Sequence, residues 1–417
     1  MIRFIHTADI HFGMENYGKI DPQTGIHSRL LDFKKSLDTC IQYAIDEQVD
    51  LFVFAGDAYK TAHPTPTQQK LLIDSFMKLY QARIPTVIVV GNHDNPLSFG
   101  KANALDIFAH LPIDGFHVFS KPNAITIETK SGPIQVVGIP WPNRHNLAIN
   151  TDHNSSSASE LTQHISQSLA HITQQLAASL NQEIPAILVG HLTVSSGVFS
   201  GSEKRAVYGQ DPILLPSQLA IQPFDYIALG HLHRFQNVNP QGTIPIVYSG
   251  SIDRIDFGER KEEKGFCDVT IHSKTSTTFH HVIIPTRPFI QIDVMLHDQS
   301  DATEQVLQQL AKHKIKDAIV KITYELPTSM ADSVDVKQIQ KHCADAMFLV
   351  GIIPIRISPT RPHRDLLKHE MNLETLLHTY FESQETLKKR ATVLTDKALK
   401  LDDLAQEYET TTESPDS

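Results

Sequence analysis

Five short apolar runs in the first 233 residues end in side chains that bind metal ions or carry protons. In chain order the endings are Asp9-x-His11, Gly56-Asp57, Gly91-Asn92-His93-Asp94, Gly190-His191 and Gly230-His231-x-His233. One Asp or His after a strand is commonly a cap or a loop residue. Five in order are not, because independent caps would include Ser and Thr, which are more usual capping types. The pattern therefore indicates one shared site.

The spacing within these motifs favours convergence. Residues i and i+2 of an extended segment point to one face, so Asp9 with His11, and His231 with His233, form two pairs. A glycine just before a ligand lets the backbone turn sharply and approach the site closely. Ligands in open α/β sheets gather at the carboxyl ends of the strands, so we expect all five endings to meet there.

Seven of these side chains are candidate metal ligands: Asp9, His11, Asp57, Asn92, His191, His231 and His233. Oxygen and imidazole donors without thiolate suit octahedral Mn, Fe or Mg better than structural zinc. Two cations roughly 3.5–4 Å apart need a bridging group, and a carboxylate such as Asp57 has two oxygens for it. Such a pair of ions activates water and stabilises charge on a phosphoryl oxygen. The sequence therefore predicts phosphoryl chemistry at a two-metal centre.

The elements that must position this set alternate over residues 1–284. Apolar runs rich in Val, Ile and Phe predict strands over 2–11, 50–57, 86–94, 134–141, 186–191 and 225–233. Apolar residues at spacings of three and four predict helices over 30–47, 66–83 and 158–180. The alternation predicts an α/β layered domain.

Two further segments follow. After a Pro-Thr-Arg-Pro stretch, residues 285–358 predict strand, helix, strand, helix and strand in a small α/β second domain. A second stretch rich in proline and basic residues, over 358–364, begins the last segment. Residues 359–417 are charged and helical in pattern, and end in an acidic tail that we expect to be disordered.

Composition narrows the class of protein. Cys40, Cys267 and Cys343 form no CxxC pair, which excludes a disulfide framework and favours a reducing cytoplasm. The first residues lack a basic region followed by an apolar core, and no run approaches the roughly 20 apolar residues that cross a bilayer, so neither secretion nor a membrane partner is expected. No P-loop motif occurs. A net charge of -10 means that DNA binding would need a local basic patch.

In this order and approximate spacing, the five motifs resemble the calcineurin-like metallophosphoesterase superfamily. Longer stretches, including GHLTVSSGVFSGSEK and YSGSIDRIDFGERKEEKGF, resemble its bacterial DNA-repair nucleases, and the likeness covers about two thirds of the chain. The resemblance implies a β-sandwich flanked by helices, and two Mn2+ with Mg2+ or Fe as alternatives. It implies exonuclease and endonuclease action on DNA ends and hairpins, near the nucleoid. It also implies a homodimer within a heterotetramer that contains a coiled-coil ATPase.

The resemblance also implies roles for individual residues. One ion would bind Asp9, His11, Asp57 and His233, and the other Asp57, Asn92, His191 and His231. His93 would face the scissile phosphate, and protonate the leaving oxygen or stabilise the transition state. Asp94 either orients a ligand or His93, or forms a turn before Pro96. Some relatives have a second catalytic histidine where this chain has Lys60, so that histidine's role is in doubt here.

Several basic residues are candidate phosphate contacts near the predicted rim: Lys60, Arg144, Lys204, Arg205, Arg234, Arg254, Arg260 and Lys261. Each has the alternative of an ordinary surface charge. Trp141 either stacks on a base or belongs to the core.

The C-terminal helices are the candidate docking element for the ATPase, because their apolar residues are too many for a freely solvated tail: Leu366, Leu367, Met371, Leu373, Leu376, Leu377, Tyr380 and Phe381. The alternative is that this stripe packs on its own domain. Two other functions stay open, a small-molecule phosphodiesterase or phosphatase on the same metal core, and a non-catalytic scaffold.

Overall fold

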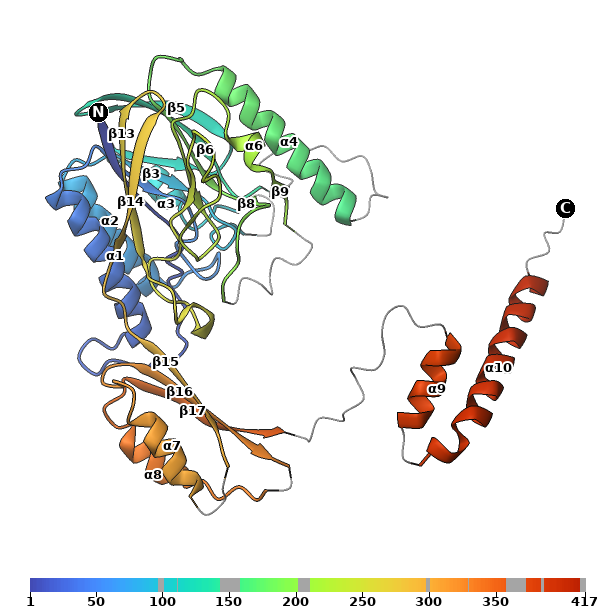
Figure 1. Cartoon of the computed structure of the whole chain (residues 1–417). Coiled ribbons are helices and arrows are strands. Elements are labelled where there is room, and N and C mark those ends of the chain that lie inside the picture. Colours follow the sequence, from blue (N-terminus) through green and yellow to red (C-terminus); the bar gives the residue numbers. More distant parts are fainter. Residues whose placement is uncertain are drawn as a thin grey trace. The chain divides into compact units, whose positions relative to one another are not determined.

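The computed structural model describes residues 1–96, 101–110, 112–142, 158–201, 211–297, 301–328, 330–357, 373–383 and 386–412. Within these residues, the strands of two six-stranded sheets lie between residues 2 and 283 (Figure 1). Arg144, Lys204, Arg205, Leu366, Leu367 and Met371 lie outside them.

The first sheet has the order β14-β13-β1-β2-β3-β4. Its strands are β1 (Ile2–Thr7), β2 (Leu51–Phe54), β3 (Thr86–Val89), β4 (Phe116–Phe119), β13 (Gly265–Ser273) and β14 (Ser276–Ile283). Strands β1 to β4 are parallel, with Phe4 opposite Leu51 and Phe52 opposite Thr86. Strand β13 is antiparallel to β1 and to β14. The parallel register brings the ends of β1, β2 and β3 to one edge.

The second sheet has the order β11-β12-β10-β7-β6-β5. Its strands are β5 (Asn123–Thr129), β6 (Gly132–Ile139), β7 (Ala186–His191), β10 (Tyr226–Gly230), β11 (Gln236–Asn237) and β12 (Ile246–Tyr248). Strands β6, β7, β10 and β12 are parallel, and Gly230 lies opposite His191. A two-stranded sheet joins β8 (Thr193–Val194) to β9 (Ile213–Leu214).

Alternating side chains fill three apolar layers. The inner layer packs Phe4, Val53 and Val87 of the first sheet with residues of the second sheet such as Ile187 and Ala228. The outer face of the first sheet packs on α1 (Ser28–Asp46) and α2 (Pro66–Gln81). The outer face of the second packs on α4 (Ala158–Ala178) and α6 (Pro216–Leu219). The predicted β-sandwich flanked by helices is confirmed, and Figure 1 shows the helices on its two outer faces.

The described chain divides into two compact units. One comprises Met1–Val294, Thr303–Thr323 and Val334–Ile353, and the other Met295–Ala302, Tyr324–Ser333 and Pro354–Ser417. The predicted boundaries at residues 284 and 358 stay predictions. A short helix, α3 (Asp106–His110), lies between β3 and β4 in the chain.

Later elements follow the predicted alternation. A three-stranded sheet of order β15-β16-β17 comprises β15 (Phe289–Met295), β16 (Ile319–Pro327) and β17 (Phe348–Ile357), with α7 (Ala302–Leu310) and α8 (Val336–His342) between its strands. The C-terminal segment forms α9 (Leu373–Ser383) and α10 (Ala391–Thr412). No helix in the described part of the chain is long and apolar enough to cross a membrane.

Candidate metal centre

Four of the predicted site residues have unusual backbone conformations. Asp9, His11, Asp57 and His231 have φ values of 54°, 54°, 57° and 98°. Positive φ is uncommon for residues other than glycine and recurs at functional sites. The amides of Asp9 and His11 donate to Gly56 O and Asp57 O, at 2.9 and 3.1 Å. The chain after β1 is therefore fixed to the chain after β2, and the side chains of both turns are held in place.

Close approach between these turns needs glycine. A Cβ at Gly91 would lie 2.1 Å from Asp57 Oδ1, so a side chain there would displace the carboxylate. A Cβ at Gly230 would lie 2.2 Å from Ala55 O, which joins the two sheets at the same edge. Both glycines precede candidate ligands, as the sequence predicted.

The first half of the centre contains Asp9, His11 and His233. One ligand atom from each lies within 4.8 Å of the others, and all three side chains are buried. The Nε2 atoms of His11 and His233 are 3.1 Å apart. Imidazole nitrogens this close could be held by one ion, and imidazole suits the divalent transition metals. The Asp9 carboxylate accepts the His231 N–H, with both oxygens at 3.1 Å.

The second half contains Asn92, His191 and His231. Asn92 Oδ1 lies 2.9 Å from His191 Nε2 and 3.2 Å from His231 Nδ1. The His191 Nδ1–H donates to Ala55 O at 2.8 Å, which leaves Nε2 toward the centre. His231 Nε2 lies 3.1 Å from Asp211 Oδ2, which leaves Nδ1 toward the centre. Each imidazole thus has one nitrogen held by the protein and one available to an ion.

Asp57 lies between the halves. Its Oδ2 is 3.6 Å from His11 Nε2 and 3.4 Å from His191 Nε2, while Oδ1 accepts the His93 N–H at 2.9 Å. The side chain is 2% exposed. This position is the one that a bridging carboxylate requires.

His93 lies at the edge of the centre. Its Nδ1–H donates to Lys60 O at 2.7 Å, and its Nε2 lies 4.0 Å from Asp57 Oδ2. The side chain is 43% exposed, whereas that of His11 is 5% exposed. His93 therefore lies within 4.8 Å of the ligand atoms of His11 and Asp57, but unlike them it is open to solvent.

Asp94 contacts backbone and not a candidate ligand side chain. Its Oδ2 accepts the N–H groups of Asp57 and Gly91 at 2.8 and 3.1 Å, and its Oδ1 accepts that of Tyr59 at 3.1 Å. Burial, with the nearby Asp57 charge, raises the pKa of Asp94 to about 7. Asp94 thereby ties the turn after β3 to the turn after β2 and sets the position of Asp57.

The donor set fits divalent cations. Asp9 and Asp57 are 0% and 2% exposed, and neither forms an ion pair with a Lys or Arg among the described residues. Burial raises the pKa of Asp9 to about 6. Burial lowers the pKa of His191, but Asp57, with Asp9 and the Ala55 carbonyl, more than offsets it and raises the pKa to about 9. Buried negative charge that attracts protons in this way is suited to metal ions.

The family of the protein follows from a match to a known family. Residues 2–235, more than half of the chain, match the model of the calcineurin-like phosphoesterases. The chain belongs to the calcineurin-like phosphoesterase family. A member of this family is a metal-dependent hydrolase, and the Asp and His clusters are consistent with its two-metal centre.

Two solved structures are similar to this phosphoesterase. A dimetal phosphatase from Danio rerio matches with 11% identity and a TM-score of 0.39, and a protein from Thermus thermophilus with 11% identity and a TM-score of 0.37. Each match covers 67% of this chain and 98% of the other.

Two carboxylates of the phosphoesterase centre were not predicted. Asp211 contacts His231, and Glu259 Oε1 accepts the His233 Nδ1–H at 2.8 Å. Asp211 lies in a loop and Glu259 in a short 3-10 turn, Phe257–Glu259, and neither stretch has strand or helix periodicity in its sequence. The one available signal for Glu259 was its place between Ile255 and Lys264 in a stretch quoted for the family resemblance.

The basic candidates among the described residues differ in whether their charged groups are exposed or already bound within the chain. Arg234 and Lys60 are exposed. Arg254 donates to Thr286 Oγ1, and its Nη2 donates to Glu262 O at 2.7 Å, so its guanidinium is largely occupied within the chain. Arg260 donates to Phe257 O at 2.9 Å. Arg234 and Lys261 line a cavity of about 500 Å3, but Glu262 and Glu263 line it too.

Trp141 lies beside the second half of the centre. Its ring centroid is 4.8 Å from that of His231 at an interplanar angle of 37°, and 6.1 Å from that of His191. It is partly exposed. Trp141 is thus a rim residue and not part of the apolar core.

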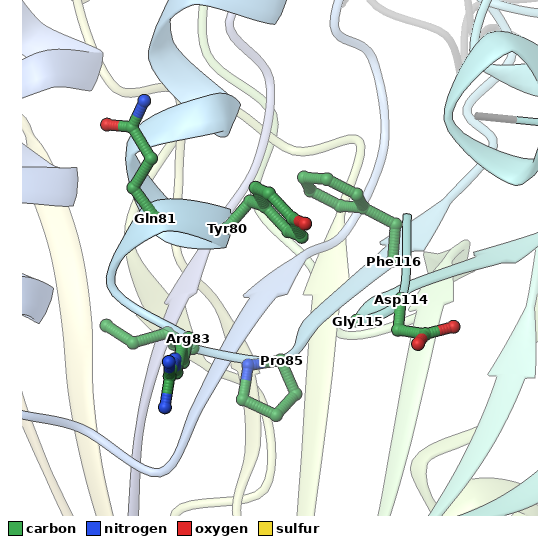
Figure 2. A pocket seen from close by; sticks show the side chains of 8 residues that line it. Tyr80, Gln81, Arg83, Pro85, Asp114, Gly115 and Phe116 are labelled. Atoms are coloured by element: carbon green, nitrogen blue, oxygen red, sulfur yellow. The ribbon is translucent and has the colours of Figure 1, made fainter. Parts of the chain in front are cut away.

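Another cavity, of about 400 Å3, lies at the opposite end of the first sheet. Tyr80 at the end of α2 and Phe116 at the start of β4 line it, together with Arg83, Pro85 and Asp114 (Figure 2). It lies where β3 and β4 begin, whereas the metal centre lies where the strands end. Its lining contains no histidine.

Proposed function

We propose that the chain is the DNA-cleaving subunit of an SbcCD-type repair complex. In this proposal it is an SbcD-like exonuclease and endonuclease that hydrolyses phosphodiester bonds at DNA ends and hairpins with two Mn2+. The observation that supports it is a set of seven donors in two halves around Asp57, six of them buried and Asn92 half-buried, with one exposed histidine at the edge. The family resemblance of the long loop motifs selects DNA among the phosphoester substrates.

The candidate ligands would hold two ions. One ion would be bound by Asp9, His11 and His233. The other would be bound by Asn92, His191 and His231, and Asp57 would contact both ions. When bound, the ions would activate water and stabilise negative charge on the phosphoryl oxygens. The surrounding carboxylates and carbonyls orient the imidazoles, and burial excludes competing water from the ligands.

His93 would act on the leaving 3′ oxygen. Because its Nδ1–H is bound to Lys60 O, only Nε2 is available to the substrate. A proton can pass from Nε2 to the leaving oxygen only when the ring is an imidazolium. A neutral ring with its proton on Nδ1 would have no proton to donate there.

The proposed partner is an SbcC-type coiled-coil ATPase that binds the C-terminal helices, within a heterotetramer that contains two copies of this chain. None of the described side chains of α9 is buried, and Leu373 and Tyr380 are 45% and 50% exposed. Such a helix has apolar surface available for a partner. DNA would be bound near the rim by Arg234 and Lys60. The proposed location is the cytoplasm, near the nucleoid.

A cleavage assay tests this proposal. Purified protein is incubated with hairpin and blunt-ended DNA and Mn2+ or Mg2+, with and without the ATPase. Metal-dependent shortening of blunt DNA and opening of hairpins are expected. Hydrolysis of nucleotide monoesters without any cleavage of DNA would instead indicate a small-molecule phosphatase. Protein that takes up no metal and cleaves neither substrate would indicate a scaffold.

A further inference from the structure

We propose that Glu259 is a positioning residue for the ligand His233, and that Lys264 fixes Glu259 for this purpose. The inference rests on the proposed metal centre and adds to it a residue outside every ligand motif. Glu259 ends the short 3-10 turn η1 (Phe257–Glu259), in the loop before β13. It touches neither the reacting phosphate nor an ion in this proposal, and acts through His233.

Both carboxylate oxygens of Glu259 are used. Oε1 accepts the His233 Nδ1–H at 2.8 Å. Oε2 accepts from Ile255 N–H at 3.0 Å, from Ser251 Oγ at 3.1 Å and from Lys264 Nζ at 2.8 Å. The residue is 0% exposed, so these contacts replace its water entirely. A carboxylate held at four points has one orientation, and it imposes that orientation on the imidazole.

Lys264 reinforces the same ligand from a second direction. It is 2% exposed, and its Nζ donates to His233 O and to Ser251 Oγ, both at 2.9 Å. Its ammonium also lies 2.9 Å from Glu262 Oε2. The ion pair therefore holds both the ring and the backbone of His233.

Stability alone does not account for this pair. A buried ion pair is often no more stabilising than apolar residues of similar volume. A carboxylate that accepts the N–H of a ligating histidine fixes its tautomer and raises its basicity. With the proton on Nδ1, the lone pair of His233 Nε2 faces His11 Nε2, 3.1 Å away. The polar pair thus lies where it has a ligand to orient.

Packing makes η1 a firm support. Phe257 at its start contacts the rings of Phe289 and Tyr17, with centroids 5.0 and 5.3 Å apart. The Asp256 side chain accepts the Gly258 N–H at 2.7 Å and caps the turn. Glu259 consequently cannot follow His233 if the histidine rotates.

Metal titration tests the proposal independently of DNA cleavage. Metal-free wild-type protein and its Glu259→Gln variant are titrated with Mn2+ by calorimetry, and bound metal is counted after dialysis. We expect one of the two ions to bind the variant about 10–100-fold more weakly, as is typical when such a supporting partner is lost. The matched control is Glu262→Gln, which removes the other carboxylate near Lys264 without touching His233. It should bind both ions within about twofold of the wild type.

A double variant separates orientation from folding. Glu259→Gln alone leaves the buried Lys264 with less compensation, which is destabilising. Glu259→Gln combined with Lys264→Met removes both charges and should recover the thermal stability while one ion still binds weakly. Two wild-type affinities in the single variant, or in the folded double variant, would overturn the proposal. Wild-type protein that binds two ions but cleaves no DNA would overturn the proposed nuclease function alone.

Discussion

The two ends of the first sheet both contain residues in the left-handed region, with different consequences. At the carboxyl ends of the strands, Asp9 and Asp57 have φ values of 54° and 57°. At the amino ends, Gln48 before β2 and Arg83 before β3 have φ values of 48° and 58°. Gln48 and Arg83 directly follow the C-caps of α1 and α2, and both are exposed. A left-handed residue there simply ends a helix.

The difference shows which feature marks a site. Asp9 and Asp57 are buried, and their carboxylates converge with imidazoles from the second sheet. Arg83 lines a cavity beside Tyr80 and Phe116 in which no donor set gathers. Backbone strain is therefore shared by both ends, and the convergence of buried polar groups belongs to one.

The largest expected effect is at Asp57. We expect Asp57→Asn to reduce bound metal from two ions to a trace and hydrolysis to background, because one oxygen serves both halves of the centre. Metal analysis and a DNA-cleavage assay measure the two quantities. Asp114→Asn, at the exposed cavity of the other end, is the matched control and should keep both. A variant that retains two ions would refute the bridging role.

A substitution of His93 should distinguish residues that bind the metal ions from a residue that acts on the substrate. We expect His93→Ala to lower kcat by about 10²–10⁴-fold, the usual range for a lost general acid, with two ions still bound. Its exposure of 43% and its contact with Lys60 O place it apart from the buried donors. Steady-state cleavage kinetics and metal analysis on the same sample check this. Loss of both ions would show that His93 is a ligand.

Glu259 and Asp211, the carboxylates beside His233 and His231, should differ in how much they contribute to the stability of the fold. Lys264→Met leaves the buried Glu259 without its ammonium partner and should lower the free energy of unfolding by about 3–5 kcal/mol. Asp211→Asn should change it by less than about 1 kcal/mol, because Asp211 is 12% exposed and its neutral amide still accepts a hydrogen bond. Denaturant unfolding of the metal-free variants measures both. Equal losses would mean that the two histidines are supported alike.

Much of the candidate metal centre could be predicted from the sequence, because a candidate ligand at the end of a buried strand leaves a local signal. The apolar run, the glycine and the polar ending mark Asp57 and His191 without knowledge of the partners. The same logic fails for Asp211 and Glu259, which contact the candidate ligands His231 and His233 from outside the predicted strands. Their roles depend on contacts across 20 and 26 residues, which no local pattern encodes.

The fold shows the same division. Strands β1, β2, β3, β7 and β10 were predicted because each is buried and apolar. The β13–β14 hairpin was not predicted. Every residue of β14 is exposed or half-buried, and the strand is rich in Ser, Thr and His, so its pairing with β13 provides the order that its composition does not.

Substitution of Trp141 would test whether DNA binds at the side of the candidate centre next to His231. We expect Trp141→Ala to raise KM for DNA with little change in kcat. The loss should correspond to about 1–3 kcal/mol of binding free energy, which is the contribution of one base stacked on an aromatic ring. Trp141→Phe, which keeps a ring beside His231, should restore much of the binding. A fall in kcat and in metal content, with KM unchanged, would show that the ring supports His231 and not the substrate.

The smallest effect is expected at the other end of the sheet. Arg83→Gly should raise the free energy of unfolding by up to about 1 kcal/mol, because glycine adopts φ near 58° without the clash of a Cβ. The gain is limited because glycine also has more freedom in the unfolded chain. Cleavage and metal content should not change, whereas Asp9→Gly, which relieves a similar φ at the metal end, should abolish both. Equal tolerance at the two positions would mean that the carboxyl end holds no centre, since strain relief would then be the only consequence of either change.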